Sequence, residues 1–173
     1  MLKGVRHLAA LFALAVMCSA CAEPDTSTKQ SASEPVAVPP DTRIRLERTR
    51  CFGKCPIYIL ELSADGSVVY TGKENVTTKG RAEGRITQTD LKQLLDGFER
   101  IDYFSLTGDY VDRHSCPSYA TDNPSALTAV RFNGRSNAVY HYLGCGGLAA
   151  LERLTVMERA IDRAANSNQW IGE

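Results

Sequence analysis

Hydrophobic and polar residues alternate in two separate parts of the chain, and alternation with a period of two is typical of β-strands. Residues 57–63 (IYILELS) alternate in this way, and an ADG turn then reverses the chain into the similar run SVVYTG. Farther along, 127–132 and 137–142 alternate on either side of Asn133 and Gly134. The order strand, glycine turn, strand predicts an antiparallel hairpin in each part.

Two other segments repeat apolar residues every three or four positions, which is the spacing of an amphipathic helix. They are 88–101, with Thr87 as a candidate N-cap, and 148–165. The order strand, turn, strand, helix thus occurs twice, as in two hairpin-plus-helix units. We predict an α+β fold in which an antiparallel sheet of about five to six strands carries both helices on one face.

Three further segments complete the domain. RIRLERTR (43–50) is either a basic strip for an anionic partner, such as lipopolysaccharide or phospholipid headgroups, or an edge strand whose arginines discourage pairing with another molecule. We favour the edge strand, because Glu47 interrupts the basic strip. The polar, glycine-containing segment 73–84 predicts a long loop or an irregular hairpin. Trp170 is expected to fold back onto the core.

The chain begins with the pattern of a secretory signal peptide, which we assign to 1–20. Lys3 and Arg6 precede a run of ten apolar residues, which is too short to span a bilayer. The tetrapeptide CSAC that ends at Cys21 resembles a lipobox, so we predict that Cys21 becomes the acylated N-terminus. Cleavage after Ala22 by an ordinary signal peptidase is the alternative.

Residues 21–42 are rich in Ser, Thr, Pro and acidic side chains and have almost nothing to bury, so we predict a lipid-anchored, disordered tether. Acylation of Cys21 would make the membrane a partner through the lipid. Ala22 is not the aspartate that holds some bacterial lipoproteins at the inner membrane, which favours the outer membrane with the domain facing the periplasm. A soluble periplasmic or secreted protein is the alternative.

The composition fits one globular domain, assigned to 43–173. The chain has 173 residues, of which 43% are hydrophobic and 23% are charged. Removal of Lys3 and Arg6 with the leader leaves 18 of the 20 basic residues against 20 acidic ones. This near-neutral balance gives no indication of nucleic-acid binding.

Four cysteines lie beyond the leader and the candidate acylation site: Cys51, Cys55, Cys116 and Cys145. An even number in an oxidising compartment indicates disulfides, with three possible connectivities. Cys51 and Cys55 flank Gly53, and the turn that this implies would permit a disulfide between them. The neighbouring Lys54 would favour a thiolate, so thiol exchange at this pair is the alternative.

The loop at 108–124 holds most of the remaining candidates for chemistry. Its possible ligands are Asp109, Asp112, His114, Cys116 and Asp122. Together they would make a metal site or a hydrolytic centre. Their spacing matches no known metal motif, and Asp also bonds nearby backbone in ordinary loops, so we predict neither a metal nor another cofactor. His141, alone on an alternating strand, is expected to be packed rather than catalytic.

Several motifs resemble those of a known family. They are CFGKCPIY, a DG turn followed by VVYTG, TDNPSALTAVRFNG, VYHY and NQWIG. Over roughly 44–172 the chain resembles an uncharacterised bacterial domain family of envelope proteins with a CFGxCPxY signature. The resemblance implies an exported or lipid-anchored single domain in which Cys51 and Cys55 belong together, and it implies no catalytic residue. We predict the pair Cys51–Cys55 together with Cys116–Cys145, which would join the long loop to the end of the last strand.

Two functional hypotheses follow. The first is a non-enzymatic, lipid-anchored envelope protein, a monomer that binds or supports an envelope protein or an anionic envelope component. The second is a periplasmic thiol-redox or hydrolytic enzyme that uses Cys51 and Cys55 or the loop at 109–122. The sequence contains no GxSxG, phosphate-loop or dinucleotide motif, which favours the first hypothesis.

Overall fold

The computed structural model describes residues 37–172, so the predicted signal peptide, Cys21 and most of the predicted tether lie outside the described residues. Seven strands form one sheet in the order β4-β3-β2-β1-β7-β8-β5, and two short strands pair separately as β6-β9. Neighbours in the large sheet run antiparallel, except that β5 is parallel to β8. In chain order the strands are β1 (Arg43–Arg48), β2 (Ile57–Ser63), β3 (Ser67–Glu74), β4 (Gly80–Arg85), β5 (Asp109–Tyr110), β6 (Ser118–Tyr119), β7 (Ser125–Phe132), β8 (Arg135–Tyr142) and β9 (Cys145–Gly146).

The α+β class is confirmed, with both predicted hairpins present as β2–β3 and β7–β8. The sheet has more strands than we predicted, because its two outermost strands show no apolar alternation. β4 comes from the segment assigned to a loop or irregular hairpin, and none of its side chains is fully buried. β5 is only two residues long. Such strands are positioned by backbone hydrogen bonds to a neighbour, and those bonds leave no pattern in the side chains.

β1 is the central strand, which contradicts our assignment of RIRLERTR to an edge. It pairs with β2 on one side and with β7 on the other. Ile44 and Leu46 are almost fully buried in the core. Arg45 lies on the opposite, open face of the sheet, with Glu47 at 2.8 Å and Glu61 at 3.4 Å. The acidic neighbours offset the charge of this arginine, so it does not mark a free edge.

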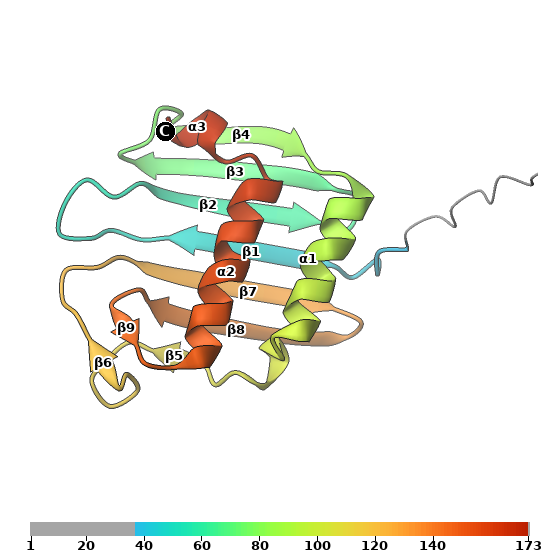
Figure 1. The fold of residues 1–173 in the computed structure, drawn as a ribbon. Coiled ribbons are helices and arrows are strands. Elements are labelled where there is room, and N and C mark those ends of the chain that lie inside the picture. Colours follow the sequence, from blue (N-terminus) through green and yellow to red (C-terminus); the bar gives the residue numbers. More distant parts are fainter. Residues whose placement is uncertain (1–36, 173) are drawn as a thin grey trace, which may run out of the picture. The chain divides into compact units, whose positions relative to one another are not determined.

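Two long helices cover one face of the sheet (Figure 1). The helices are α1 (Gln88–Arg100), η1 (Tyr103–Ser105, a 3-10 turn), α2 (Ala149–Ala164) and α3 (Asn168–Ile171). Thr87 caps α1 as predicted, since its hydroxyl accepts a hydrogen bond from the backbone N–H of Asp90 at 3.0 Å. Gly97 allows close approach of the two long helices, because a Cβ there would lie 2.6 Å from Sδ of Met157.

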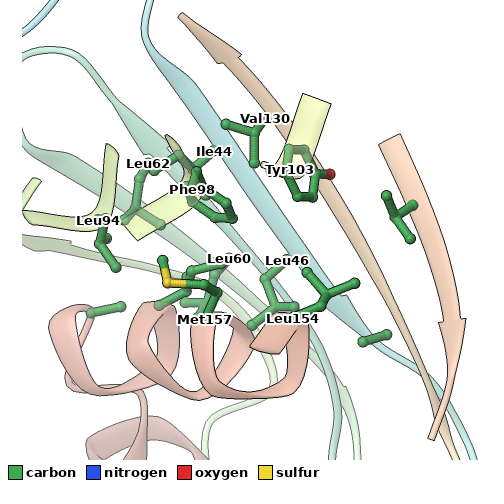
Figure 2. Close-up of a cluster of buried hydrophobic side chains, with 14 of the residues drawn as sticks. Ile44, Leu46, Leu60, Leu62, Leu94, Phe98, Tyr103, Val130, Leu154 and Met157 are labelled. Atoms are coloured by element: carbon green, nitrogen blue, oxygen red, sulfur yellow. The ribbon is translucent and has the colours of Figure 1, made fainter. Parts of the chain in front are cut away.

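The core lies between the sheet and these helices (Figure 2). Leu46 and Leu60 from the central strands face Leu154 of α2, and all three side chains are fully buried. Trp170 folds back onto the core as predicted and is 7% exposed. Its ring stacks on Tyr70 with the ring centroids 4.9 Å apart, which fastens α3 to the sheet.

Residues 37–42 contact the domain, although we assigned them to the tether. Val38 packs against the core. The carboxylate of Asp41 accepts hydrogen bonds from the backbone N–H groups of Asn133 at 3.0 Å and Gly134 at 2.8 Å. These contacts fix the start of the domain to the turn between β7 and β8.

The connections of the sheet lie at two opposite ends (Figure 1). At one end, called here the cysteine end, are the loops 49–56, 111–124 and 143–148, which contain the four described cysteines. At the other, the turn end, are residues 37–42 and the β7–β8 turn at 133–134. β1 runs from the turn end to the cysteine end, so the chain enters the domain at the end opposite its disulfides.

Candidate functional site

Two disulfides hold the cysteine end together. Cys51 and Cys55 are bonded with their Cα atoms 5.7 Å apart, and Cys116 and Cys145 with theirs 5.1 Å apart. This is the connectivity that we selected from the sequence. Cys116 and Cys145 are buried, whereas Cys51 and Cys55 are half-buried at the surface. The Cys116–Cys145 bond therefore fixes the interior of this end, and the Cys51–Cys55 bond closes a small surface loop.

The loop between Cys51 and Cys55 presents Phe52 to solvent, with 88% of the residue exposed. The backbone N–H of Phe52 donates to the carbonyl of Asp122 at 3.3 Å, and Nδ2 of Asn75 donates to the carbonyl of Cys55 at 3.1 Å. Two separate segments therefore hold the loop in addition to its disulfide. The aromatic ring of Phe52 therefore projects into solvent from a loop that is held in place.

A groove of about 420 Å³ opens beside this loop, with Cys55 in its wall. One side comes from the end of β1 and the start of β2, including Arg48 and Tyr58. The other side is the last part of α2, including Arg159 and Arg163. The groove therefore lies where the central strands and the second helix meet at the cysteine end.

A charged network forms one wall of the groove. Arg48 pairs with two acidic residues of α2, placing Nη1 3.2 Å from Glu158 and Nη2 2.8 Å from Asp162. Tyr58 donates its hydroxyl hydrogen to the second carboxyl oxygen of Asp162 at 2.7 Å. The side chain of Glu158 is fully buried and also lies 3.1 Å from Nδ1 of His141. The network thus runs from the core to the groove.

Burial and charge have opposite effects on Arg48. Desolvation disfavours its guanidinium, but the carboxylates of Asp162 and Glu158 outweigh this and raise the pKa of Arg48 above its usual value. The pKa of Tyr58 is also raised, first by burial and then by the neighbouring Asp162 carboxylate. At neutral pH the phenol therefore keeps its proton and acts as a hydrogen-bond donor.

The remaining basic side chains of the groove are differently placed. Arg159 and Arg163 are one helical turn apart on α2 and are exposed, and neither forms an ion pair with any residue in 37–172. The apolar part of the groove includes Pro56, Leu143 and Ile171. The surface therefore combines two cations at its rim with apolar walls, a combination suited to an anionic group attached to an apolar one.

A second hollow of about 620 Å³ lies on the open face of the sheet. Two of its three arginines have acidic partners, since Arg45 pairs with Glu61 and Arg131 lies 3.8 Å from Asp41, whereas Arg43 forms no ion pair within the described chain. We therefore place the candidate site in the groove at the cysteine end, where the rim arginines have no such partner within the described chain.

The loop candidates at 109–122 do not assemble into a site. Asp112 accepts hydrogen bonds from the backbone N–H groups of His114 at 3.0 Å and Ser115 at 2.9 Å, which is local turn chemistry. These bonds, led by those from Ser115, lower the pKa of Asp112. Within residues 37–172 no three His, Cys, Asp or Glu side chains gather as a metal site would require. His141 is 2% exposed and packed as expected, but it belongs to the charged network.

Sequence reasoning missed the α2 residues of the site, although one signal was present. Glu158 falls in the same helical stripe as Leu151, Leu154 and Ile161, which are buried. An acidic residue in an apolar stripe requires a buried cation or donor nearby. Its partner Arg48 lies 110 positions earlier in the chain, so spacing alone does not identify the pair.

These features define a class: an α+β domain with two helices on one face of a mostly antiparallel sheet and disulfide-bonded loops at one end. Within that class, the family described as "Domain of unknown function (DUF6438)" matches residues 42–165, and the chain belongs to it. No match was found among curated proteins. No helix within the described part of the chain is long and apolar enough to cross a membrane.

Proposed function

We propose that this protein is a non-enzymatic, lipid-anchored envelope protein that binds an anionic group of another envelope component in the groove at the cysteine end. The observation that carries this proposal is the pair of rim arginines, Arg159 and Arg163, without ion-pair partners in the described chain above an apolar-walled groove. Exposed, unpaired cations beside desolvating walls favour association with an anion.

The placement of the groove supports this proposal. An acyl chain on Cys21 would be joined through residues 22–36 to the turn end. The six residues of β1 then separate the turn end from the groove by about 17 Å. The chain therefore enters the domain at the end opposite the groove, so the point of attachment does not obstruct the groove. We propose the outer membrane, with the groove facing the periplasm, as the location.

Binding fits the groove better than turnover does. Arg48, Tyr58 and Asp162 hold one another in place, so the polar groups nearest the core are already engaged. Thiol exchange is a second candidate, because the half-buried Cys55 lies in the wall of the groove. An insulin-reduction assay separates the two. If the protein is a binding module, it should reduce insulin no faster than its Cys51→Ser/Cys55→Ser variant does.

Photocrosslinking in intact cells tests the binding role. A benzophenone amino acid replaces Asn168, which is exposed in the groove, or Ser136, which is exposed at the turn end. We expect adducts from position 168 that disappear when Arg159 and Arg163 are both changed to Ala. Equal adducts from both positions, or adducts that persist in the double variant, would contradict a site in the groove.

The anchor has its own test. We expect Cys21→Ala to move the protein from the membrane fraction to the soluble fraction, because acylation then has no acceptor. Ser31→Ala, also before the domain but outside the lipobox, is the matched control and should leave fractionation unchanged. Retention of the Cys21→Ala protein with the outer membrane would refute lipid anchoring while leaving the groove hypothesis intact.

A further inference from the structure

We infer that the partner of the groove is an acidic, apolar peptide segment of another protein, and that Phe52 is the anchor residue of this interface. The inference rests on the proposed function, because it uses the same groove and names its ligand class. It requires a carboxylate beside Arg159 and Arg163 and an apolar partner surface against Phe52.

The exposure of Phe52 is the first argument. Of the described residues, the other exposed large apolar side chains are Val111 and Val156, which are 38% and 59% exposed, against 88% for Phe52. Burial of an exposed aromatic ring by a partner contributes roughly 25 cal/mol of free energy for each Å² of apolar surface covered. Aromatic residues are also those that most often dominate the binding energy of interfaces.

The support of Phe52 is the second argument. The Cys51–Cys55 bond closes the loop, and hydrogen bonds from Phe52 to Asp122 and from Asn75 to Cys55 fix it to its surroundings. A residue held in this way loses little backbone freedom on binding, so more of the contact energy remains as affinity. A disulfide around a solvent-exposed phenylalanine is thus suited to a preformed contact.

Charge decides what kind of segment fits. The groove is lined by Arg48, Arg159 and Arg163 against Asp162, and Arg48 is already paired with two carboxylates. The cations that remain for a partner are therefore the two rim arginines, which suits one or two carboxylates better than a cluster of phosphates. Lys54 adds a cation within the loop itself, so a basic partner would be repelled.

Size and shape favour a peptide over a lipid surface. A volume of about 420 Å³ is near the lower limit of ligand sites and accommodates a few side chains. A membrane-binding face presents several apolar residues on one surface. Here the exposed large apolar residues of the described chain stand on three different elements: the 51–55 loop, the segment after β5, and α2.

The experiment uses the full-length protein, purified with its lipid in detergent micelles. The probe is a pool of fluorescein-labelled nonapeptides of Glu, Leu, Phe and Ser, and a matched pool has Gln in place of Glu. We expect the acidic pool to bind, and the Gln pool to bind at least roughly tenfold more weakly. Phe52→Ala, and separately the pair Arg159→Ala/Arg163→Ala, should each weaken binding of the acidic pool by a similar factor.

Two surface variants serve as matched controls. Val156→Ala removes another exposed apolar side chain, and Arg153→Ala removes another exposed arginine of α2 that does not line the groove. Both should bind the acidic pool within roughly twofold of the unchanged protein. Thermal unfolding of every variant shows that the fold is retained, which is expected because all five substituted residues are exposed.

The outcomes separate the inference from the proposed function. Equal binding of both pools, or unchanged binding by Phe52→Ala and the double arginine variant, overturns the inference. Binding to phosphatidylglycerol vesicles but not to the acidic pool overturns it in favour of a lipid. If the acidic peptides do not bind but arginine-dependent crosslinks at position 168 are found in cells, only the ligand class is wrong. If no arginine-dependent crosslinks are found either, the proposed function is also wrong.

Discussion

At the scale of single residues, Glu158 joins His141 in the core to Arg48 at the groove. Its carboxylate is fully buried, one oxygen lying 3.2 Å from Arg48 and the other 3.1 Å from His141. A buried pair of this kind is costly to desolvate, and removal of one partner leaves a charge without compensation. The network therefore fixes the position of Arg48 at the groove, whatever its net effect on stability.

We predict that Glu158→Ala lowers the free energy of unfolding by about 3–5 kcal/mol, because Arg48 would remain buried without one of its carboxylates. Urea unfolding measures the change. Glu152→Ala, an exposed glutamate on the same helix, is the control and should stay within about 0.5 kcal/mol of the unchanged protein. A loss under about 1 kcal/mol for Glu158→Ala would show that the network is not tightly coupled to the fold.

At the scale of elements, local patterns predicted what formed but not always where it was placed. The alternation of 57–63 and 137–142 and the cap at Thr87 were sufficient for two hairpins and a helix. The same alternation in β1 cannot distinguish a central strand from an edge strand. Glu47 is only two positions from Arg45 on the same strand, but Glu61 becomes a neighbour of Arg45 only when the sheet assembles. Alternation indicates which side chains are buried, and it does not indicate the order of the strands in the sheet.

The segment before β1 gives a prediction about acid stability. Backbone hydrogen bonds, led by the one from Gly134, lower the pKa of Asp41 below its ordinary value. A carboxyl whose pKa is lower in the folded state stabilises the fold above its unfolded pKa, near 4, and this contribution is lost as the pH falls through the folded pKa. Asp41→Asn should therefore destabilise the domain at pH 7 and make progressively less difference as the pH falls below about 4.

Urea unfolding of both proteins at neutral pH and at several values below 4 measures this difference. Asp109→Asn is the control, because the side chain of Asp109 is exposed and makes no hydrogen bond within the described chain, so its effect should be small at every pH. A constant difference between Asp41→Asn and the unchanged protein across this range would mean that the carboxylate charge does not hold residues 37–42 to the β7–β8 turn.

At the scale of the whole molecule, the sheet separates the point where the chain enters the domain from the candidate site. The chain enters at the turn end (Figure 1). Both disulfides, the exposed Phe52 and the groove lie at the cysteine end. The sequence indicated the cysteines that pair and the hairpins between them. It did not indicate the groove, because Arg48 reaches Asp162 across 114 positions, and only the packing of α2 on the sheet brings them together.

The two disulfides should differ in their effect on stability, because they close loops of different length. The Cys116–Cys145 bond spans 29 positions and the Cys51–Cys55 bond only 4. Chain entropy alone gives about 3.5 kcal/mol for the longer loop and about 2 kcal/mol for the shorter one. We predict that Cys116→Ser/Cys145→Ser lowers the free energy of unfolding by more than Cys51→Ser/Cys55→Ser, and urea unfolding of both variants measures this.

The same geometry sets the order of reduction in the unchanged protein. Cys116 and Cys145 are 3% and 6% exposed, so a reductant reaches them only after local opening, whereas Cys51 and Cys55 are accessible at the surface. With a mild reductant, iodoacetamide should label Cys51 and Cys55 first, as detected by peptide mass. Earlier labelling of Cys116 would mean that the cysteine end opens at its interior before its surface loop.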